Sequence, residues 1–204
     1  STDLLEAVQA GEKGVLGVRQ VNGFCKKRVP TEEPDVAYKI TRKASLSIPT
    51  RDIFPDGIPE DFSVIATFKA KKKTKGYMFV IYDSLMSAPL LGLYVTKKSA
   101  KFVYSEQNGS PGLEASPEFA VNMADGKWHR VGISVKGQQV TLMYDCEEKG
   151  YLFLNRTETG PQIDMEGSLF ISQHPLSDDV FMVGWGLGFT MTFFHSLEKY
   201  KQCS

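Results

Sequence analysis

The side chains that most often carry out catalysis are few and scattered in this sequence. Its three histidines lie far apart: His129, His174 and His195. No Gly-x-Ser-x-Gly segment and no phosphate-binding glycine loop occurs. A glycoside hydrolase needs two carboxylates that face each other across a cleft. The nearest candidate is Asp164-Met165-Glu166, which Gly167 interrupts, so we interpret it as a structural loop. The sequence predicts no enzyme, and we expect His129 to be a rim side chain rather than a catalytic base.

Three cysteines raise the question of a disulfide: Cys25, Cys146 and Cys203. None belongs to a Cys-x-x-Cys pair, and no His/Cys cluster has the spacing of a zinc site. The cysteines alone leave two interpretations open, namely three buried thiols in a cytosolic protein, or one disulfide plus an odd cysteine with an external partner. Two glycosylation sequons, at Asn108 and Asn155, favour a secreted protein, and we predict both as glycosylation sites.

Lysines are concentrated in two short segments: Lys69, Lys71, Lys72, Lys73 and Lys75, then Lys97, Lys98 and Lys101. The chain as a whole has 24 basic and 24 acidic residues and no net charge, which excludes a polycationic nucleic-acid binder. Heparin and heparan sulfate are extended polyanions, so they need several cations aligned on one surface. If the surrounding strands run up and down, alternate loops share one end of the fold, and all eight lysines gather there. We predict heparin binding by these lysines; the alternative is a solvated loop that keeps an edge soluble.

The elements that would position these residues are short strands. The 204 residues are 42% apolar and 24% charged, a globular composition. Short apolar runs separated by turn residues predict strands at 62–68, 77–82, 91–95, 101–104, 131–135, 139–144, 169–171 and 189–194. A short helix is expected from the cap Asp3 to Gly11. We predict an all-β, two-sheet antiparallel sandwich, a single domain over 1–204. No run of 18 apolar residues occurs, so we expect no membrane insertion.

The clearest hairpin joins 131–135 to 139–144 through Lys136-Gly137-Gln138. Val131, Ile133 and Val135 share one face of the first strand. On the second strand, period-two alternation groups Val140, Leu142, Tyr144 and Cys146. Alternation therefore predicts that Cys146 points toward the core.

A resemblance to a known family rests on this hairpin. The segments 125–135 and 142–146 resemble the signature hairpin of laminin-G-like domains, and more narrowly the thrombospondin N-terminal-like branch. Three further segments fit that branch: 23–25, 35–40, and 49–55 followed by 59–63. Their order and spacing are similar to the amino-propeptide of fibrillar collagens of the type V and XI group. The resemblance covers roughly residues 3 to 181, and the carboxy-terminal residues depart from the family pattern.

The resemblance implies a laminin-G/concanavalin-like jelly roll and a non-enzymatic, secreted module of the extracellular matrix. At the amino end of a collagen chain, such a module would sterically regulate fibril assembly and bind glycosaminoglycans and other matrix proteins. Family members pair the position of Cys146 with the carboxy-terminal region. The resemblance therefore implies a Cys146–Cys203 disulfide that leaves Cys25 unpaired within these residues; Cys25–Cys203 is the competing pairing.

An alternative is a carbohydrate- or receptor-binding laminin-G-like domain of another matrix protein, with a calcium ion at its rim. Calcium needs several oxygen ligands from adjacent loops, and Asp83 and Asp125 are the candidates. We expect no other cofactor. A Gly-x-y run beyond Ser204 would favour the collagen interpretation.

Overall fold

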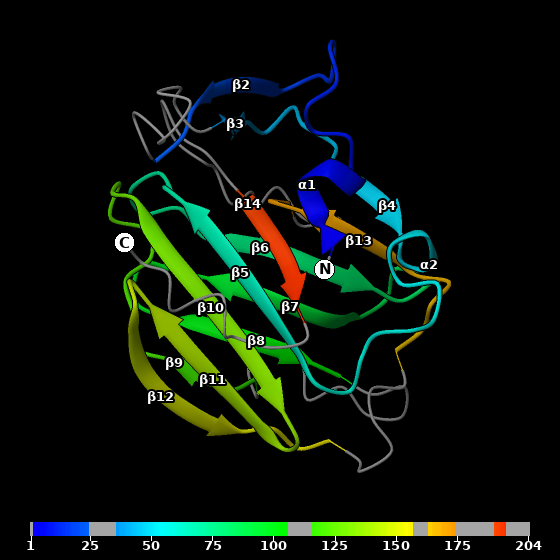
Figure 1. The fold of residues 1–204 in the computed structure, drawn as a ribbon, viewed down its shortest axis with the longest axis vertical. Helices are drawn as coiled ribbons and strands as arrows, with labels where there is room; N and C mark the ends of the chain where they lie inside the picture. The colour runs from blue at the N-terminus through cyan, green and yellow to red at the C-terminus, as the bar shows by residue number, and fades with distance from the viewer. Residues whose placement is uncertain (1, 25–35, 106–115, 157–162, 174–189, 195–204) are drawn as a thin grey trace, which may run out of the picture.

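Two antiparallel sheets face each other, and a small ribbon lies at one side of them (Figure 1). The computed structural model describes residues 2–24, 36–105, 116–156, 163–173 and 190–194. Within these residues, the first sheet has the order β1 (Thr2–Asp3), β14 (Thr190–Phe194), β5 (Phe62–Phe68), β10 (His129–Lys136), β11 (Gln139–Tyr144) and β12 (Glu147–Phe153). The predicted all-β sandwich is confirmed.

The second sheet has the order β4 (Ser47–Pro49), β13 (Ser168–Ile171), β6 (Gly76–Tyr82), β7 (Pro89–Val95), β8 (Ala100–Tyr104) and β9 (Glu118–Phe119). The ribbon pairs β2 (Val18–Asn22) with β3 (Val36–Ile40). The helices are α1 (Leu4–Ala7) and α2 (Thr50–Ile53). Strand β1 pairs with β14, so segments from near the beginning and near the end of the described residues are neighbours in the first sheet.

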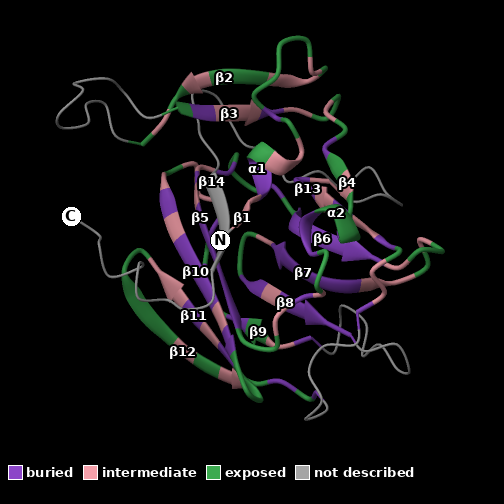
Figure 2. Cartoon of the chain, turned by 45° about the vertical axis from the view of Figure 1, so that its right-hand side comes forward, coloured by how far each residue is buried: buried purple, intermediate pink, exposed green. Residues whose placement is uncertain are grey.

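The core lies between the sheets and follows from alternation along the strands. On β10, Val131, Ile133 and Val135 are buried and face inward, as predicted. β6 is buried on both faces, which its uninterrupted apolar sequence predicts for an inner strand. Its inner residues Phe79 and Ile81 join the main core, while Tyr77 and the neighbouring outward residues form a second apolar cluster. Figure 2 shows the buried residues concentrated along these inner strands.

Helix α1 begins where the sequence predicts and ends earlier. The carboxylate of Asp3 accepts hydrogen bonds from the backbone N–H groups of Leu5 and Glu6, at 2.9 and 3.2 Å. Gln9, with φ of 55°, takes the left-handed conformation that closes the turn, so the expected extension to Gly11 is wrong.

Candidate functional site: the lysine end of the sandwich

The two lysine-bearing loops lie at the same end of the second sheet. In the register, Gly76 at the start of β6 pairs with Val95 at the end of β7, and Val95 also pairs with Ala100 at the start of β8. The loop before β6 (69–75) and the loop between β7 and β8 (96–99) are therefore neighbours. Loop 69–75 also carries the chain from the first sheet to the second, since β5 and β6 belong to different sheets. We call this end, with the segment 120–128, the lysine end.

The segment 120–128 packs directly against the first lysine loop. The N–H of Lys73 donates to the carbonyl of Ala124 at 3.1 Å. A β-carbon built on Gly126 would lie only 3.1 Å from Cγ of Lys72, so the aliphatic stem of that lysine covers the glycine. This contact brings Lys127, which is exposed, to the same end. Sequence reasoning missed Lys127 because no local pattern places it beside a loop more than 50 residues earlier.

Most of the predicted lysines reach solvent. The exposed ones are Lys71, Lys72, Lys73, Lys75, Lys97 and Lys98. Lys69 is half-buried, and so is Lys101, whose Nζ lies 3.6 Å from a carboxylate oxygen of Glu118. The loop 96–99 is held by Thr96, whose hydroxyl accepts from the N–H groups of Lys98 and Ser99 at 3.1 and 3.0 Å. A fixed turn thus presents its two lysines outward.

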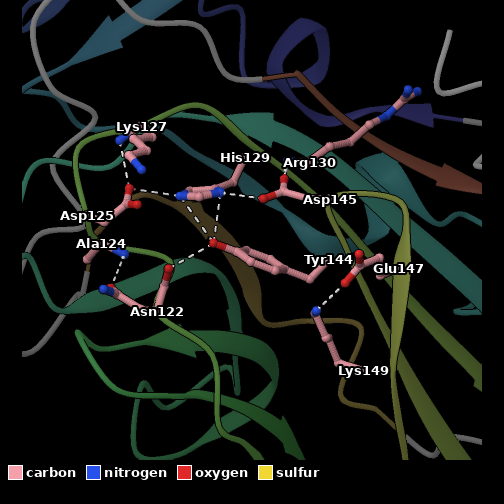
Figure 3. A network of polar contacts seen from close by, with 10 residues as sticks. All are labelled: Asn122, Ala124, Asp125, Lys127, His129, Arg130, Tyr144, Asp145, Glu147 and Lys149. Carbon is pink, nitrogen blue, oxygen red and sulfur yellow. Dashed lines mark hydrogen bonds and ion pairs between the residues drawn. The ribbon is translucent and has the colours of Figure 1, made fainter.

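The carboxylates beside this surface are occupied by other partners. His129 is only 7% exposed and lies between two of them: Nε2 is 2.8 Å from Asp125 Oδ1, and Nδ1 is 2.8 Å from Asp145 Oδ2 (Figure 3). Asp145 also accepts from the N–H of Arg130 at 2.9 Å. Glu147 pairs with Lys149 at 2.6 Å. Among the described residues, no carboxylate forms an ion pair with Lys71, Lys72, Lys73, Lys97 or Lys98.

Tyr144 completes the network around the histidine. Its ring stacks on the ring of His129, with centroids 4.9 Å apart and 28° between the planes. Its hydroxyl donates to the carbonyl of Asn122 at 2.8 Å, tying β11 to the segment 120–128. Burial and the nearby carboxylates of Asp145 and Asp125 raise the pKa of Tyr144, so the phenol stays protonated and keeps donating. The network joins β10, β11 and the segment 120–128 through His129, which is buried rather than exposed at the rim.

The lowered pKa of Asp125 is consistent with its place in the His129 network. Burial by itself would raise the pKa of Asp125, but hydrogen bonds from His129 and from the N–H of Lys127 outweigh it and hold the pKa below its usual 3.8. The carboxylate therefore stays ionised and keeps the segment 120–128 in place at neutral pH.

Cys146 does not point toward the core, so that prediction is wrong. β11 ends at Tyr144, and Asp145 and Cys146 have φ of 48° and 69°. Two consecutive left-handed residues form the tight turn into β12, which breaks the alternation and leaves Cys146 exposed. Cys146 is disulfide-bonded. Cys25 and Cys203 both lie outside the described residues, so the pairing with Cys203 stays a prediction.

The two candidate calcium ligands are at opposite ends of the sandwich. Asp125 is beside the start of β6 through the Lys73–Ala124 contact, whereas Asp83 follows the last residue of that strand. Asp83 accepts instead from the N–H groups of Ser87 and Ala88, at 2.6 and 3.0 Å, and closes its own loop. Among the described residues, no three His, Cys, Asp or Glu side chains cluster closely enough to hold a metal ion. These residues do not fit a rim calcium ion built on Asp83 and Asp125.

The two carboxylates of the hydrolase candidate, Asp164 and Glu166, have partners in and beside their own loop. Asp164 accepts from the N–H of Glu166 and from the N–H of Ser84, both at 2.9 Å. Glu166 pairs with Arg51 at the surface. A β-carbon on Gly167 would lie 1.9 Å from the carbonyl oxygen of Tyr82, so the chain packs too closely there for any other residue. The remaining candidates His174, His195 and Asn108 fall outside the described residues.

A family model described as "Laminin G domain" matches residues 68–185, more than half of the 204 residues. The chain belongs to the laminin G domain family. Laminin G domains are typically extracellular, non-enzymatic binding modules. The match includes the β10–β11 hairpin and both lysine loops.

Solved structures share the fold of this laminin G domain at low sequence identity. Domains LG4-5 of the mouse laminin alpha1 chain match with a TM-score of 0.54 and 11% identity, over 89% of this chain and 43% of that chain. The carbohydrate-binding module CBM40 of the Ruminococcus gnavus IT-sialidase, bound to α2,3-sialyllactose, matches with a TM-score of 0.57 and 10% identity. The match covers 87% of this chain and 92% of that chain. Domain 4 of the arabinanase AbnA from Geobacillus stearothermophilus, in complex with arabinotriose, matches with a TM-score of 0.55 and 10% identity. The match covers 90% of this chain and 85% of that chain.

This laminin G domain thus spans less than half of the laminin chain that it matches. None of the helices in its described part has the length and apolar character needed to cross a bilayer.

Proposed function

We propose that this laminin G domain binds heparin and heparan sulfate through the lysine end. One observation carries the proposal: the register Gly76–Val95–Ala100 makes neighbours of two lysine loops that lie far apart in the sequence. The proposed contact residues are those of the sequence prediction: Lys69, Lys71, Lys72, Lys73, Lys75, Lys97, Lys98 and Lys101. Lys127 joins them.

The chemistry of the ligand follows from the shape of this surface. The lysines are spread over loops at one end of the sandwich rather than gathered around a cavity, so they suit an extended polyanion. The neighbouring carboxylates Asp125, Asp145 and Glu147 form their ion pairs with His129 and Lys149. Asp125 also lies close enough to Lys127 to interact with its charge, so Lys127 contributes less than the exposed lysines of the two loops. Lys101 contributes least, since Glu118 lies beside it.

The test is elution from immobilised heparin after charge reversal. We expect Lys72→Glu with Lys73→Glu to lower the salt concentration needed for elution, while stability changes by no more than about 0.5 kcal/mol because both side chains are exposed. The matched control is Lys13→Glu with Lys136→Glu, which makes the same change in net charge at exposed positions away from the lysine end. Equal elution of the two double variants would reduce binding to a general charge effect and contradict the proposed site.

We further propose that the module stands at the amino end of a fibril-forming collagen chain in the extracellular matrix. The support is the resemblance over residues 3 to 181, together with the laminin G family match. A two-layer sandwich is wider than a triple helix, so a retained domain would limit the lateral growth of a fibril while its lysines engage proteoglycans and other matrix proteins. The pairing of β1 with β14 supports a single domain over 1–204.

The sequence of the transcript beyond Ser204 tests the collagen context. A Gly-x-y repeat there is the expected result. A further laminin G domain in its place would contradict it and favour the alternative, a carbohydrate- or receptor-binding domain of another matrix protein. Either result leaves the heparin test valid.

A further inference from the structure

The edge strand β12 exposes two aromatic side chains on one face. Tyr151 and Phe153 are 63% and 66% exposed, although each carries a large apolar ring. They alternate with Leu152, so both point away from the core, and β12 is the last strand of its sheet within the described residues. In Figure 2 this strand forms the lower left border and is mostly coloured as exposed. An uncovered apolar face on an edge strand is a template for unwanted pairing.

The alternation continues past the end of the strand to Asn155. Leu154 and Arg156 are buried, whereas Asn155 is exposed, which places its side chain on the same side as Phe153. Residues two apart on one face of a strand are separated by about 6.6–6.8 Å. A substituent on Asn155 therefore starts on the same side of the chain as Phe153 and close to it.

The backbone at this position is fixed by three hydrogen bonds. The N–H of Leu154 donates to the carbonyl of Gln138 at 2.8 Å, and the Gln138 side chain donates to the carbonyl of Arg156 at 3.3 Å. The Arg156 guanidinium, which is 1% exposed, donates to the carbonyl of Glu60 at 2.6 Å. Asn155 is thus exposed between two anchored neighbours, just past the end of β12.

We propose that Asn155 carries an N-linked glycan whose first sugar packs on Phe153 and covers the exposed face of β12. The sequence supplies Thr157, which completes the acceptor sequon and lies outside the described residues. The proposal rests on the extracellular placement given above, because the modification occurs in the secretory pathway. A sugar ring presents polarised C–H groups along one face, and these complement the negative face of an aromatic ring.

The modification is a group transfer from a lipid-pyrophosphate-linked oligosaccharide. The side-chain nitrogen Nδ2 of Asn155 forms a bond to the anomeric carbon of the first N-acetylglucosamine. The bond between that carbon and the phosphate oxygen breaks, and the lipid pyrophosphate leaves with the electron pair. One amide proton passes to a base of the transferase. No electrons are exchanged with an oxidant or a reductant.

The first test is occupancy. The chain is secreted from eukaryotic cells with Asn108→Gln, so that Asn155 keeps the one remaining sequon. Peptide mass mapping before and after glycosidase treatment should show Asn155 glycosylated in most molecules, and Thr157→Ala should abolish the modification. Secreted protein with an unmodified Asn155 overturns the proposal.

The second test is the packing on Phe153. We compare the unfolding temperature of the glycosylated protein with that of two unglycosylated references, Thr157→Ala and Asn155→Gln. The glycan should raise Tm by about 2–4 °C in this background, a shift that a chain of this size shows for a modest stabilisation. In Phe153→Ser the gain should fall below about 1 °C. The control Leu16→Ser removes an exposed side chain at a distant loop, 71% exposed, and should leave the gain intact. An equal gain with and without Phe153 overturns the packing.

The failure of the glycan proposal can be distinguished from the failure of the heparin proposal. Heparin elution is measured on chain made without glycans, and the lysine end is opposite the Gly137-Gln138 turn where β12 ends. An unmodified Asn155 with normal heparin elution overturns only the glycan. An occupied Asn155 with no heparin binding overturns only the lysine site.

Discussion

Lys72 lies with its aliphatic stem across Gly126: a β-carbon on that glycine would stand 3.1 Å from Cγ and 3.3 Å from Cε of the lysine. Gly126 has φ of 84°, a backbone conformation that residues with a β-carbon rarely adopt. The direction of a surface lysine is thereby fixed by a glycine more than 50 residues later. This dependence can be tested without changing any charge.

Gly126→Ala should both destabilise the protein and weaken heparin binding. The left-handed backbone costs about 1–2 kcal/mol with alanine, and the added methyl group displaces the Lys72 stem. Gly57→Ala is the matched control, because Gly57 has φ of 86° but no atom within 4 Å of its added carbon. Both variants should lose similar stability in thermal unfolding, and only Gly126→Ala should elute from heparin at lower salt. Identical elution of the two would show that Lys72 does not depend on this contact.

Asp125→Asn should change the acid sensitivity of the fold. The pKa of Asp125 is held below 3.8 in the native state, so the unfolded chain binds more protons near that pH. The stabilisation is complete above about pH 4 and is lost as pH falls through the native pKa. The wild type should therefore unfold at a higher temperature than Asp125→Asn at pH 5, and the difference should shrink toward pH 2.

The control for this series is Asp56→Asn, an exposed aspartate outside the His129 network. Its unfolding temperature should follow that of the wild type at every pH. A constant gap between Asp125→Asn and wild type from pH 5 to pH 2 would mean that the ionised carboxylate contributes nothing to stability.

Arg156→Met should be strongly destabilising. The guanidinium is 1% exposed and donates to the carbonyl of Glu60 and to the Asp61 carboxylate, at 2.6 and 3.3 Å. Its loss removes both hydrogen bonds and the packing of a side chain that is 1% exposed, at a cost of about 1–3 kcal/mol. Arg51→Met is the comparison: Arg51 and its partner Glu166 are both more than half exposed, so we expect a change of less than about 1 kcal/mol. Chemical denaturation of the unglycosylated proteins measures both, and equal losses would contradict the buried role.

Cys146 should be joined to Cys203 in a non-reduced tryptic map. The exposed turn at Asp145-Cys146 leaves the sulfur accessible from outside the sandwich, which suits a partner beyond the last strand. A disulfide that closes so long a loop stabilises by about 4 kcal/mol in chain-entropy models. Reduction or Cys146→Ser should lower the unfolding temperature accordingly. A map that links Cys146 to Cys25 instead would exclude this pairing.

The strands that sequence reasoning could predict are those with unbroken alternation or an unbroken apolar run. β5, β6 and the β10–β11 hairpin all have one of these patterns. β12 has neither, because its register shifts opposite Leu142 and Met143 and its first residues are charged. The sequence also does not predict which sheet each strand joins, because no local pattern in loop 69–75 shows that it crosses from one sheet to the other.

The candidate site was partly predictable for a similar reason. The density of lysines and the alternation of strand direction suffice to bring 69–75 and 96–99 to one end. The packing of 120–128 against that end depends on long-range contacts, such as that between Lys73 and Ala124. The pairing of His129 with both Asp125 and Asp145 depends on side-chain geometry that no sequence pattern shows.

The pairing of β5 with β14 constrains how the chain is made. On a ribosome, β5 (62–68) is synthesised long before β14 (190–194), and at 5–20 residues per second the delay is roughly 6–25 s. Throughout that interval one side of β5 has no native neighbour. β1 cannot pair either, because its partner is also β14. The first sheet therefore reaches its full width only after residue 194 has been synthesised. Chaperone contact with the nascent chain should persist until that moment, and premature release should favour association between half-made sheets.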